Sequence, residues 1–108
     1  MSFNSDLADR IRTLLIQSGA TEKKMFGGLG FLLNGNMCVG IWKDDLIARV
    51  GPDEYPAALK RKGAREFDIT GRPMQGWVLV QGSALKSDST LNEWIELALQ
   101  FVLTLPAK

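Results

Sequence analysis

The sequence contains no histidine, and only one of its 108 residues, Cys38, is a cysteine. The missing histidines remove the commonest general base and the commonest metal ligand of proteins together. A catalytic thiol needs a base or a positive environment to ionise, and no histidine can supply one. A single cysteine also excludes an intramolecular disulfide, which fits a reducing compartment. We therefore predict a protein that is not an enzyme, with no catalytic residues, no metal site and no cofactor.

Long apolar runs are missing as well. A helix that spans a bilayer needs about 20 consecutive apolar residues, and the apolar stretches of this chain are far shorter. The amino terminus opens with the polar residues Ser2, Asn4, Ser5 and Asp6, so no basic-then-apolar signal peptide is recognised. We predict a cytoplasmic protein without a membrane partner.

Neither sign of charge is in excess, because 13 basic and 12 acidic residues give a net charge of +1. A dedicated nucleic-acid-binding protein tends to be strongly basic, although near-balance still permits a local patch. The 45% hydrophobic and 23% charged residues are ordinary for a globular protein. We predict a single domain over residues 1–108 that folds without disulfides or metals.

Two stretches near the ends of the chain carry apolar residues at the spacing of one helical face. The first covers residues 4–18, where Asn4 or Ser5 can cap the first turn. The second covers residues 89–103. Stripes of this kind are far more often core than a partner-binding surface, so we predict a helix packed on the core at each end.

Between these helices the spacing of the apolar residues changes to one that is typical of extended chain. Residues 24–33 read as a strand that several glycines interrupt. Asn34-Gly35 predicts a hairpin turn into a second strand over 37–42. Asp44-Asp45 predicts another tight turn into a third strand over 46–50. Together these signals predict a meander of three antiparallel strands.

A short helix is predicted over residues 53–61, with Asp53 as its cap. Residues 67–69 predict a brief strand, and residues 77–81, which are rich in β-formers, predict a final one. The complete order is α-β-β-β-α-β-β-α. This is an α+β fold in which helices flank an antiparallel sheet.

The candidates for chemistry favour structural roles. The glycine-rich segment 27–30 lacks the Gly-Lys-Ser/Thr ending of a phosphate-binding loop, and it lies between strands rather than before a helix. Glycines inside a strand usually mark a bulge or a close backbone approach. Cys38 lies in mid-strand, so we interpret it as buried and unreactive. Ser83, Ser87 and Ser89 surround a helix start, where hydroxyl groups usually act as caps.

One basic run is a candidate for contact with an anionic partner such as a nucleic acid. It comprises Lys60, Arg61, Lys62 and Arg65, with Arg72 nearby in the sequence. The alternative is the solvated end of a helix, where cations suit the helix dipole. Aromatic residues are not interleaved with the run, so a stacking platform for single strands is not indicated.

A second set of candidates lies on or beside the strands. Trp42 and Trp77 stand on strands and Met74 precedes one, and both residue types occur in cores and at interfaces. A meander also leaves a sheet edge free for self-association. Arg49 and Arg72 could instead hold an anion in a small-molecule-binding or enzymatic site built around the glycine segment 27–30.

Several of these stretches together resemble one known family. The residues are Lys-Met-Phe-Gly-Gly-Leu-Gly over 24–30, the Asn34-Gly35 hairpin, the strand around 45–50, and Gly-Arg-Pro-Met-Gln-Gly-Trp-Val-Leu-Val over 71–80. They look like the signature stretches of the TfoX/Sxy amino-terminal domain, and the resemblance runs from about residue 10 to residue 106. The first and last blocks are its most specific parts.

The resemblance implies a secretion-chaperone-like α+β fold with the element order given above. The named members of the family regulate natural competence and act on transcription alongside a cyclic-AMP-responsive activator. They carry a second, helical carboxy-terminal domain, whereas this sequence ends soon after its last predicted helix, so we expect a stand-alone member. No catalytic residues come with the family.

We therefore expect a non-enzymatic regulatory or protein-interaction domain whose partner is a second copy or another protein. Two alternatives stay open. The basic residues could contact a nucleic acid, or the domain could bind a small molecule. The candidate interaction residues are Arg49, Lys60, Arg61, Lys62, Arg65, Arg72, Met74 and Trp77.

Overall fold

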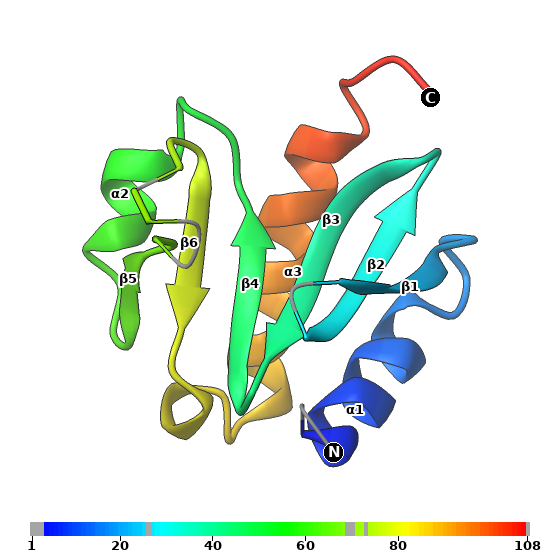
Figure 1. Cartoon of the computed structure of the whole chain (residues 1–108), viewed down its shortest axis with the longest axis horizontal. Helices are drawn as coiled ribbons and strands as arrows, with labels where there is room; N and C mark the ends of the chain where they lie inside the picture. Colours follow the sequence, from blue (N-terminus) through cyan, green and yellow to red (C-terminus); the bar gives the residue numbers. More distant parts are fainter. Residues whose placement is uncertain (1–3, 26, 69–70, 73, 108) are drawn as a thin grey trace.

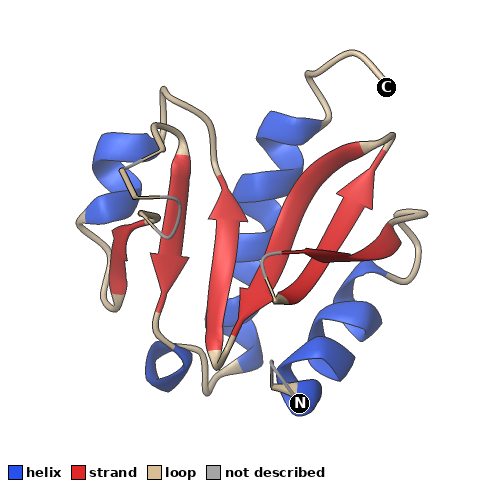
Figure 2. Ribbon diagram, viewed as in Figure 1, coloured by secondary structure: helices blue, strands red, loops and turns tan. Residues whose placement is uncertain are grey.

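A computed structural model of the chain describes residues 4–25, 27–68, 71–72 and 74–107. A six-stranded antiparallel sheet with flanking helices makes up the fold (Figures 1 and 2), so the α+β prediction is confirmed. The helices are α1 (Ser5–Leu15), α2 (Tyr55–Leu59) and α3 (Asp88–Val102), with a single 3₁₀ turn η1 (Gly82–Ala84). The strands are β1 (Thr21–Met25), β2 (Gly28–Leu33), β3 (Asn36–Trp42), β4 (Asp45–Arg49), β5 (Ala64–Glu66) and β6 (Trp77–Val80).

The strands lie in the order β1-β2-β3-β4-β6-β5, and each pairs with its neighbours in antiparallel fashion. The stretch predicted as one strand over 24–33 is two strands, β1 and β2. They separate at Gly27, whose φ of +73° is a turn conformation that glycine adopts without steric cost. The Asn34-Gly35 hairpin between β2 and β3 is confirmed, with φ of +54° and +82° at the two residues.

Three other boundaries differ from the sequence prediction. The turn before β4 is centred one residue earlier than predicted, because Lys43, with φ of +57°, takes the left-handed conformation. The brief strand predicted over 67–69 is instead β5, and Phe67 follows it as a fully buried side chain. Ile69 lies outside the described residues. Asp53 does not cap α2, since the cap position is Glu54 and no side chain bonds there.

One face of the sheet carries all the helices. In Figure 1, α3 runs behind the central strands, and it packs on β3 and β4. The apolar stripes of α1, α2 and α3 join the inward side chains of the strands in one buried cluster. Trp94 of α3 is its largest member, with 1% of its surface exposed. The sequence stripe over 89–103 is therefore core, as predicted.

The opposite face has a smaller apolar cluster of its own, in which Met37, Ile47, Phe67 and Leu79 are buried. Ile47 and Leu79 lie opposite each other on β4 and β6. Side chains alternate between the faces of a strand, so the neighbours of these residues belong to the helix side. Phe67, which follows β5, belongs to this second cluster, and Met74, which precedes β6, packs against it.

Both edges of the sheet are protected against pairing with another strand. β5 has only three residues, two of them charged. Three of the five residues of β1 are charged as well, namely Glu22, Lys23 and Lys24. Short, charged edge strands of this kind discourage edge-to-edge association. Among the described residues, no helix is long and apolar enough to cross a membrane.

Candidate functional site

The basic run over 60–65 does not form one continuous patch in the structure. Arg61 makes an ion pair with Glu93 of α3, and its guanidinium lies 5.0 Å from the ring centroid of Trp94. Arg65 on β5 lies 3.8 Å from the carboxylate of Asp68. Lys60 and Lys62 are exposed at the end of α2. Two of the four predicted cations therefore have carboxylate partners within the chain, which weakens the case for a phosphate-binding patch.

The helix-free side of the sheet brings together three of the apolar side chains singled out above. Trp42, Met74 and Trp77 are half-buried and pack on the second apolar cluster. Trp77 also contacts Phe67, with ring centroids 6.1 Å apart and planes tilted by 30°. We call Trp42, Met74 and Trp77, with the cluster beneath them, the tryptophan face.

A positively charged side chain lies over the ring of each tryptophan of this face. The Nζ of Lys43 lies 4.5 Å from the ring centroid of Trp42, and the guanidinium carbon of Arg49 lies 5.0 Å from that of Trp77. Such contacts contribute roughly 0.5–1 kcal/mol at exposed sites. They hold a positive charge close to an apolar surface at both ends of β4, since Trp42 pairs with Asp45 and Trp77 pairs with Arg49.

Arg49 is also close to a second ring. Its guanidinium carbon lies 5.6 Å from the centroid of Phe101 near the end of α3, so it is close to that ring as well as to Trp77. The sequence singled out Arg49 and Trp77 but missed Lys43 and Phe101. Phe101 carried no signal, because it belongs to a helix stripe that reads as core and only the fold places it beside the end of β4.

Arg72 is exposed and lies in the segment between β5 and β6. It has an interaction partner of its own in the structure. Arg49 and Arg72, which the sequence suggested as a possible pair of anion-holding groups, therefore belong to different segments: Arg49 ends β4, whereas Arg72 precedes β6.

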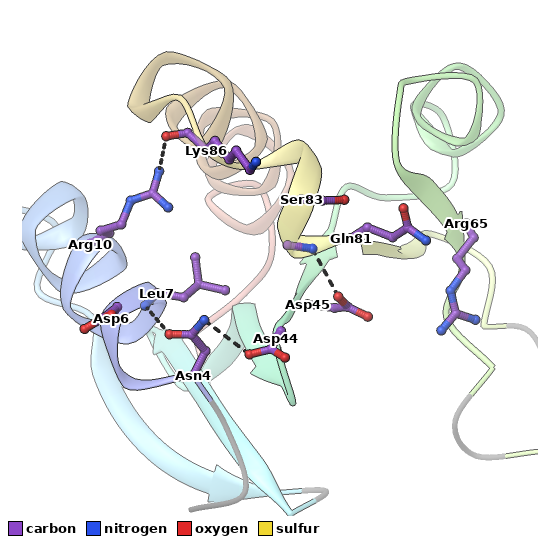
Figure 3. A pocket seen from close by; sticks show the side chains of 11 residues that line it. Asn4, Asp6, Leu7, Arg10, Asp44, Asp45, Arg65, Gln81, Ser83 and Lys86 are labelled. Carbon is purple, nitrogen blue, oxygen red and sulfur yellow. Dashed lines mark hydrogen bonds between the residues drawn. The ribbon is translucent and has the colours of Figure 1, made fainter.

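A polar depression of about 530 Å³ lies at the end of β4 opposite Arg49, between the start of α1, the β3–β4 turn and η1 (Figure 3). Several of its polar groups already bond within the chain. The amide of Asn4 donates to Asp44 at 3.2 Å, and a carboxylate oxygen of Asp45 accepts from the backbone N–H of Gly82 at 3.1 Å. Arg10 donates to the carbonyl of Leu85 at 2.6 Å. These bonds join three distant segments, which is a structural role.

Sequence patterns gave no sign of this depression, because the residues that line it are spread from position 4 to position 86. Three of them, Asp6, Asp44 and Asp45, are carboxylates. Within the described part of the chain, however, no group of three histidine, cysteine or acidic side chains has the arrangement needed to hold a metal ion.

Cys38 is buried, with 1% of its surface exposed, and burial raises the pKa of its thiol to about 12. The positive charge of Arg49 acts in the opposite direction but is the weaker influence. Pairing between β2 and β3 shifts at this point, since Phe31 faces Val39 and Leu32 faces Met37. The extra residue, Cys38, forms a bulge whose side chain enters the helix-side core. A protonated, enclosed thiol is not a nucleophile.

Comparison with known proteins gives one match. A family model described as the TfoX N-terminal domain matches residues 15–102. This range extends from the last residue of α1 to the last residue of α3 and includes the whole sheet. No curated protein and no solved structure matches the chain.

Proposed function

Because the chain belongs to the family of TfoX N-terminal domains, we propose that it is a non-enzymatic regulatory domain that binds an acidic segment of another protein on its tryptophan face. The observation that carries the proposal is the pair of half-buried tryptophans, each with a cation held over its ring. Tryptophan, methionine and arginine are enriched at protein–protein interfaces. Such residues also supply most of the binding energy where they are anchored in apolar surroundings.

The charges beside the tryptophan face favour an acidic partner. Residues that pair across a sheet share a face, and one row runs from Lys23 through Gly30, Gly40, Ile47 and Leu79 to Arg65. This row therefore has Lys23 at one end and, at the other, Arg65, which has Asp68 beside it. Lys43 and Arg49 add two more cations over the tryptophans.

Two carboxylates near this face already have partners within the chain. Asp45 accepts a hydrogen bond from the backbone of Gly82, and Asp68 lies beside Arg65. Among the described residues, neither Lys43 nor Arg49 forms an ion pair with a carboxylate. Complementary charge on a partner would raise the association rate and fix its orientation.

A second copy of the chain suits this face less well. A symmetric dimer brings the same patch of both subunits together, which would place the cations at Trp42 and Trp77 against their own copies. The protected edges of β1 and β5 also disfavour dimer formation by strand pairing. Another protein with carboxylates is therefore the partner to which we commit.

Stacking of nucleic-acid bases is also disfavoured on this face. A base needs a free aromatic surface, whereas Trp77 already has Arg49 over its ring and Phe67 against it. The rings are better suited to orient cations than to stack on a ligand.

Site-specific photo-cross-linking in cells tests the proposal. A photoreactive phenylalanine analogue replaces Lys43 on the tryptophan face or, as the control, the exposed Glu96 of α3 on the helix side. We expect an adduct with another protein from position 43 alone, through a peptide rich in Asp and Glu. Mass spectrometry identifies that peptide, and the adduct should be lost when Trp42 is changed to Ala.

Four outcomes would contradict the proposal. They are equal yields from both positions, no adduct from position 43, an adduct of the chain with itself, and an adduct with nucleic acid. An adduct of the chain with itself would identify a second copy as the occupant of the face, and an adduct with nucleic acid would identify that. Equal yields or no adduct would show that no specific partner binds there. Circular dichroism of the purified variants confirms that the substitutions leave the fold intact.

A further inference from the structure

Arg49 differs from four of the other five arginines in the way its charge is compensated. Arg10 pairs with Asp88, Arg12 with Glu22 and Asp9, Arg61 with Glu93 and Arg65 with Asp68. Arg72 has a partner too. Within the described residues, Arg49 has neither a carboxylate nor a hydrogen-bond acceptor. Its contacts are the two rings of Trp77 and Phe101.

The two rings hold the guanidinium in place without using its hydrogen-bond donors. A guanidinium carries five N–H donors in a planar fork, and aromatic contact leaves the edge of that fork available. Arg49 is half-buried, so part of its hydration is already removed. A fork positioned in advance loses little conformational entropy when it binds a ligand.

We propose that Arg49 is a carboxylate-binding site in which the fork of the guanidinium receives both oxygens of one acidic group. Arginine and a carboxylate form parallel, charge-assisted hydrogen bonds in a common plane. The inference rests on the proposed function for the source of that carboxylate, an acidic side chain of the bound protein segment. A free small carboxylate would use the same contacts.

The surroundings favour a carboxylate over a phosphate. Arg49 contributes a single positive charge, which one carboxylate neutralises, whereas a phosphate, which carries more than one negative charge at neutral pH, would leave an excess. The nearby end of α3 is the negative end of the helix dipole, and the two rings are apolar. Excess negative charge is costly there, because neither the rings nor the helix end can compensate for it.

Nuclear magnetic resonance of the intact chain tests this site with acetate, inorganic phosphate and a capped Gly-Glu-Gly-Glu-Gly peptide as probes, at constant ionic strength. The signals to follow are the Nε–H of Arg49 and the indole N–H of Trp77. We expect acetate and the peptide to shift both signals, and phosphate to shift them no more than chloride does.

Arg49→Lys keeps the charge but removes the fork, and we expect it to weaken peptide binding about tenfold. Arg12→Lys is the matched control, because it makes the same exchange at an exposed arginine of α1 on the helix side, and we expect it to leave peptide binding and the response of the Arg49 signals unchanged. Since titration of the parent chain reads Arg49 directly, the test stands even if Arg49→Lys does not fold. Indifference of both signals to acetate and peptide, or an equal response to phosphate, would overturn the inference.

The two proposals can fail separately. If acetate binds at Arg49 but no adduct forms from position 43, the carboxylate site stands and the docking of a protein segment fails. If the cross-linked partner binds Arg49→Lys as tightly as the parent chain, the docking proposal stands and the role of Arg49 fails.

Discussion

At the scale of single residues, neighbouring glycines can be required for different physical reasons. Gly27 has φ of +73° and open space where a Cβ would be, so a side chain there meets only backbone strain. Gly28 has a Cβ position 1.9 Å from the carbonyl oxygen of Ile41. The close approach of β2 and β3 at this point leaves no room for any side chain.

We expect Gly28→Ala to destabilise the domain by about 3 kcal/mol, because a backbone atom must move. Gly27→Ala should cost about 1 kcal/mol, the usual penalty for a non-glycine residue in the left-handed region. Urea denaturation of the two variants measures both values. Equal losses, or a larger loss at Gly27, would show that steric crowding at β2–β3 is not what requires glycine.

The thiol of Cys38 gives a second expectation at this scale. The unfolded thiol loses its proton near its ordinary pKa of 9.0, whereas burial keeps the folded thiol protonated up to a pKa of about 12. The unfolded state therefore binds fewer protons above pH 9, and the free energy of unfolding falls as the pH rises through that window.

In Cys38→Ala this part of the alkaline loss should disappear, so the pH slope becomes shallower even if overall stability is lower. Denaturation at one pH below 9.0 and at one between 9.0 and 12 gives the slope for each protein. Tyr55, whose pKa burial and Glu66 also raise, is common to both proteins and cancels in the comparison. Identical slopes would mean that the thiol ionises inside the folded domain.

At the scale of elements, the start of α3 depends on one hydroxyl group. The Oγ of Ser87 accepts hydrogen bonds from the backbone N–H groups of Ser89 and Thr90 at 3.1 and 3.3 Å. Ser83 and Ser89, which the sequence grouped with Ser87 as possible caps, do not hold the cap position of α3. Cap bonds satisfy N–H groups that have no partner within the helix.

Ser87→Ala should lower the free energy of unfolding by about 1 kcal/mol, which is typical of a lost cap. Ser83→Ala, at an exposed position in η1, serves as the control and should change stability by less than about 0.5 kcal/mol. Thermal denaturation of both variants measures the two changes in the free energy of unfolding. A loss at Ser83 as large as that at Ser87 would contradict the assigned cap.

The charged edge of β1 leads to an expectation about association. Lys23 and Lys24 belong to β1, which is an edge strand of the sheet that the described residues form. Replacement of both by Val raises β-propensity and removes the charges that discourage pairing. Light scattering should show more concentration-dependent association than in the parent chain.

The matched control changes two exposed lysines elsewhere, Lys60 and Lys62 at the end of α2. Lys60→Val with Lys62→Val removes the same charge and adds the same apolar surface, but away from a sheet edge. If both double variants associate equally, exposed apolar surface rather than the strand edge is responsible.

At the scale of the whole molecule, local signals predicted most of the fold. The helices at both ends, the Asn34-Gly35 hairpin and the final strand are confirmed, because each is specified by periodicity or turn chemistry within a few residues. β5 was misplaced because three residues carry too little pattern. The split between β1 and β2 was missed because the glycines of this stretch have two different roles. Gly27 forms the turn, whereas Gly28 and Gly30 belong to β2.

The site was predicted only in part, for a related reason. Trp77, Met74 and Arg49 were candidates from their residue types, but the position of Phe101 beside Arg49 depends on how α3 crosses the sheet. The pairing of Arg61 with Glu93 likewise joins residues 32 positions apart. Contacts between distant segments decide which cations are neutralised, and a single sequence does not show them.

The central claim is that the tryptophan face binds an acidic protein segment. Its most direct test is the affinity of the purified domain for the acidic peptide identified by cross-linking at position 43, compared among the parent chain, Lys43→Glu and Glu96→Lys. We expect Lys43→Glu to weaken binding at least about tenfold through charge reversal, and Glu96→Lys on the helix side to leave it unchanged. Equal affinities in all three proteins, or a loss only in Glu96→Lys, would contradict the claim.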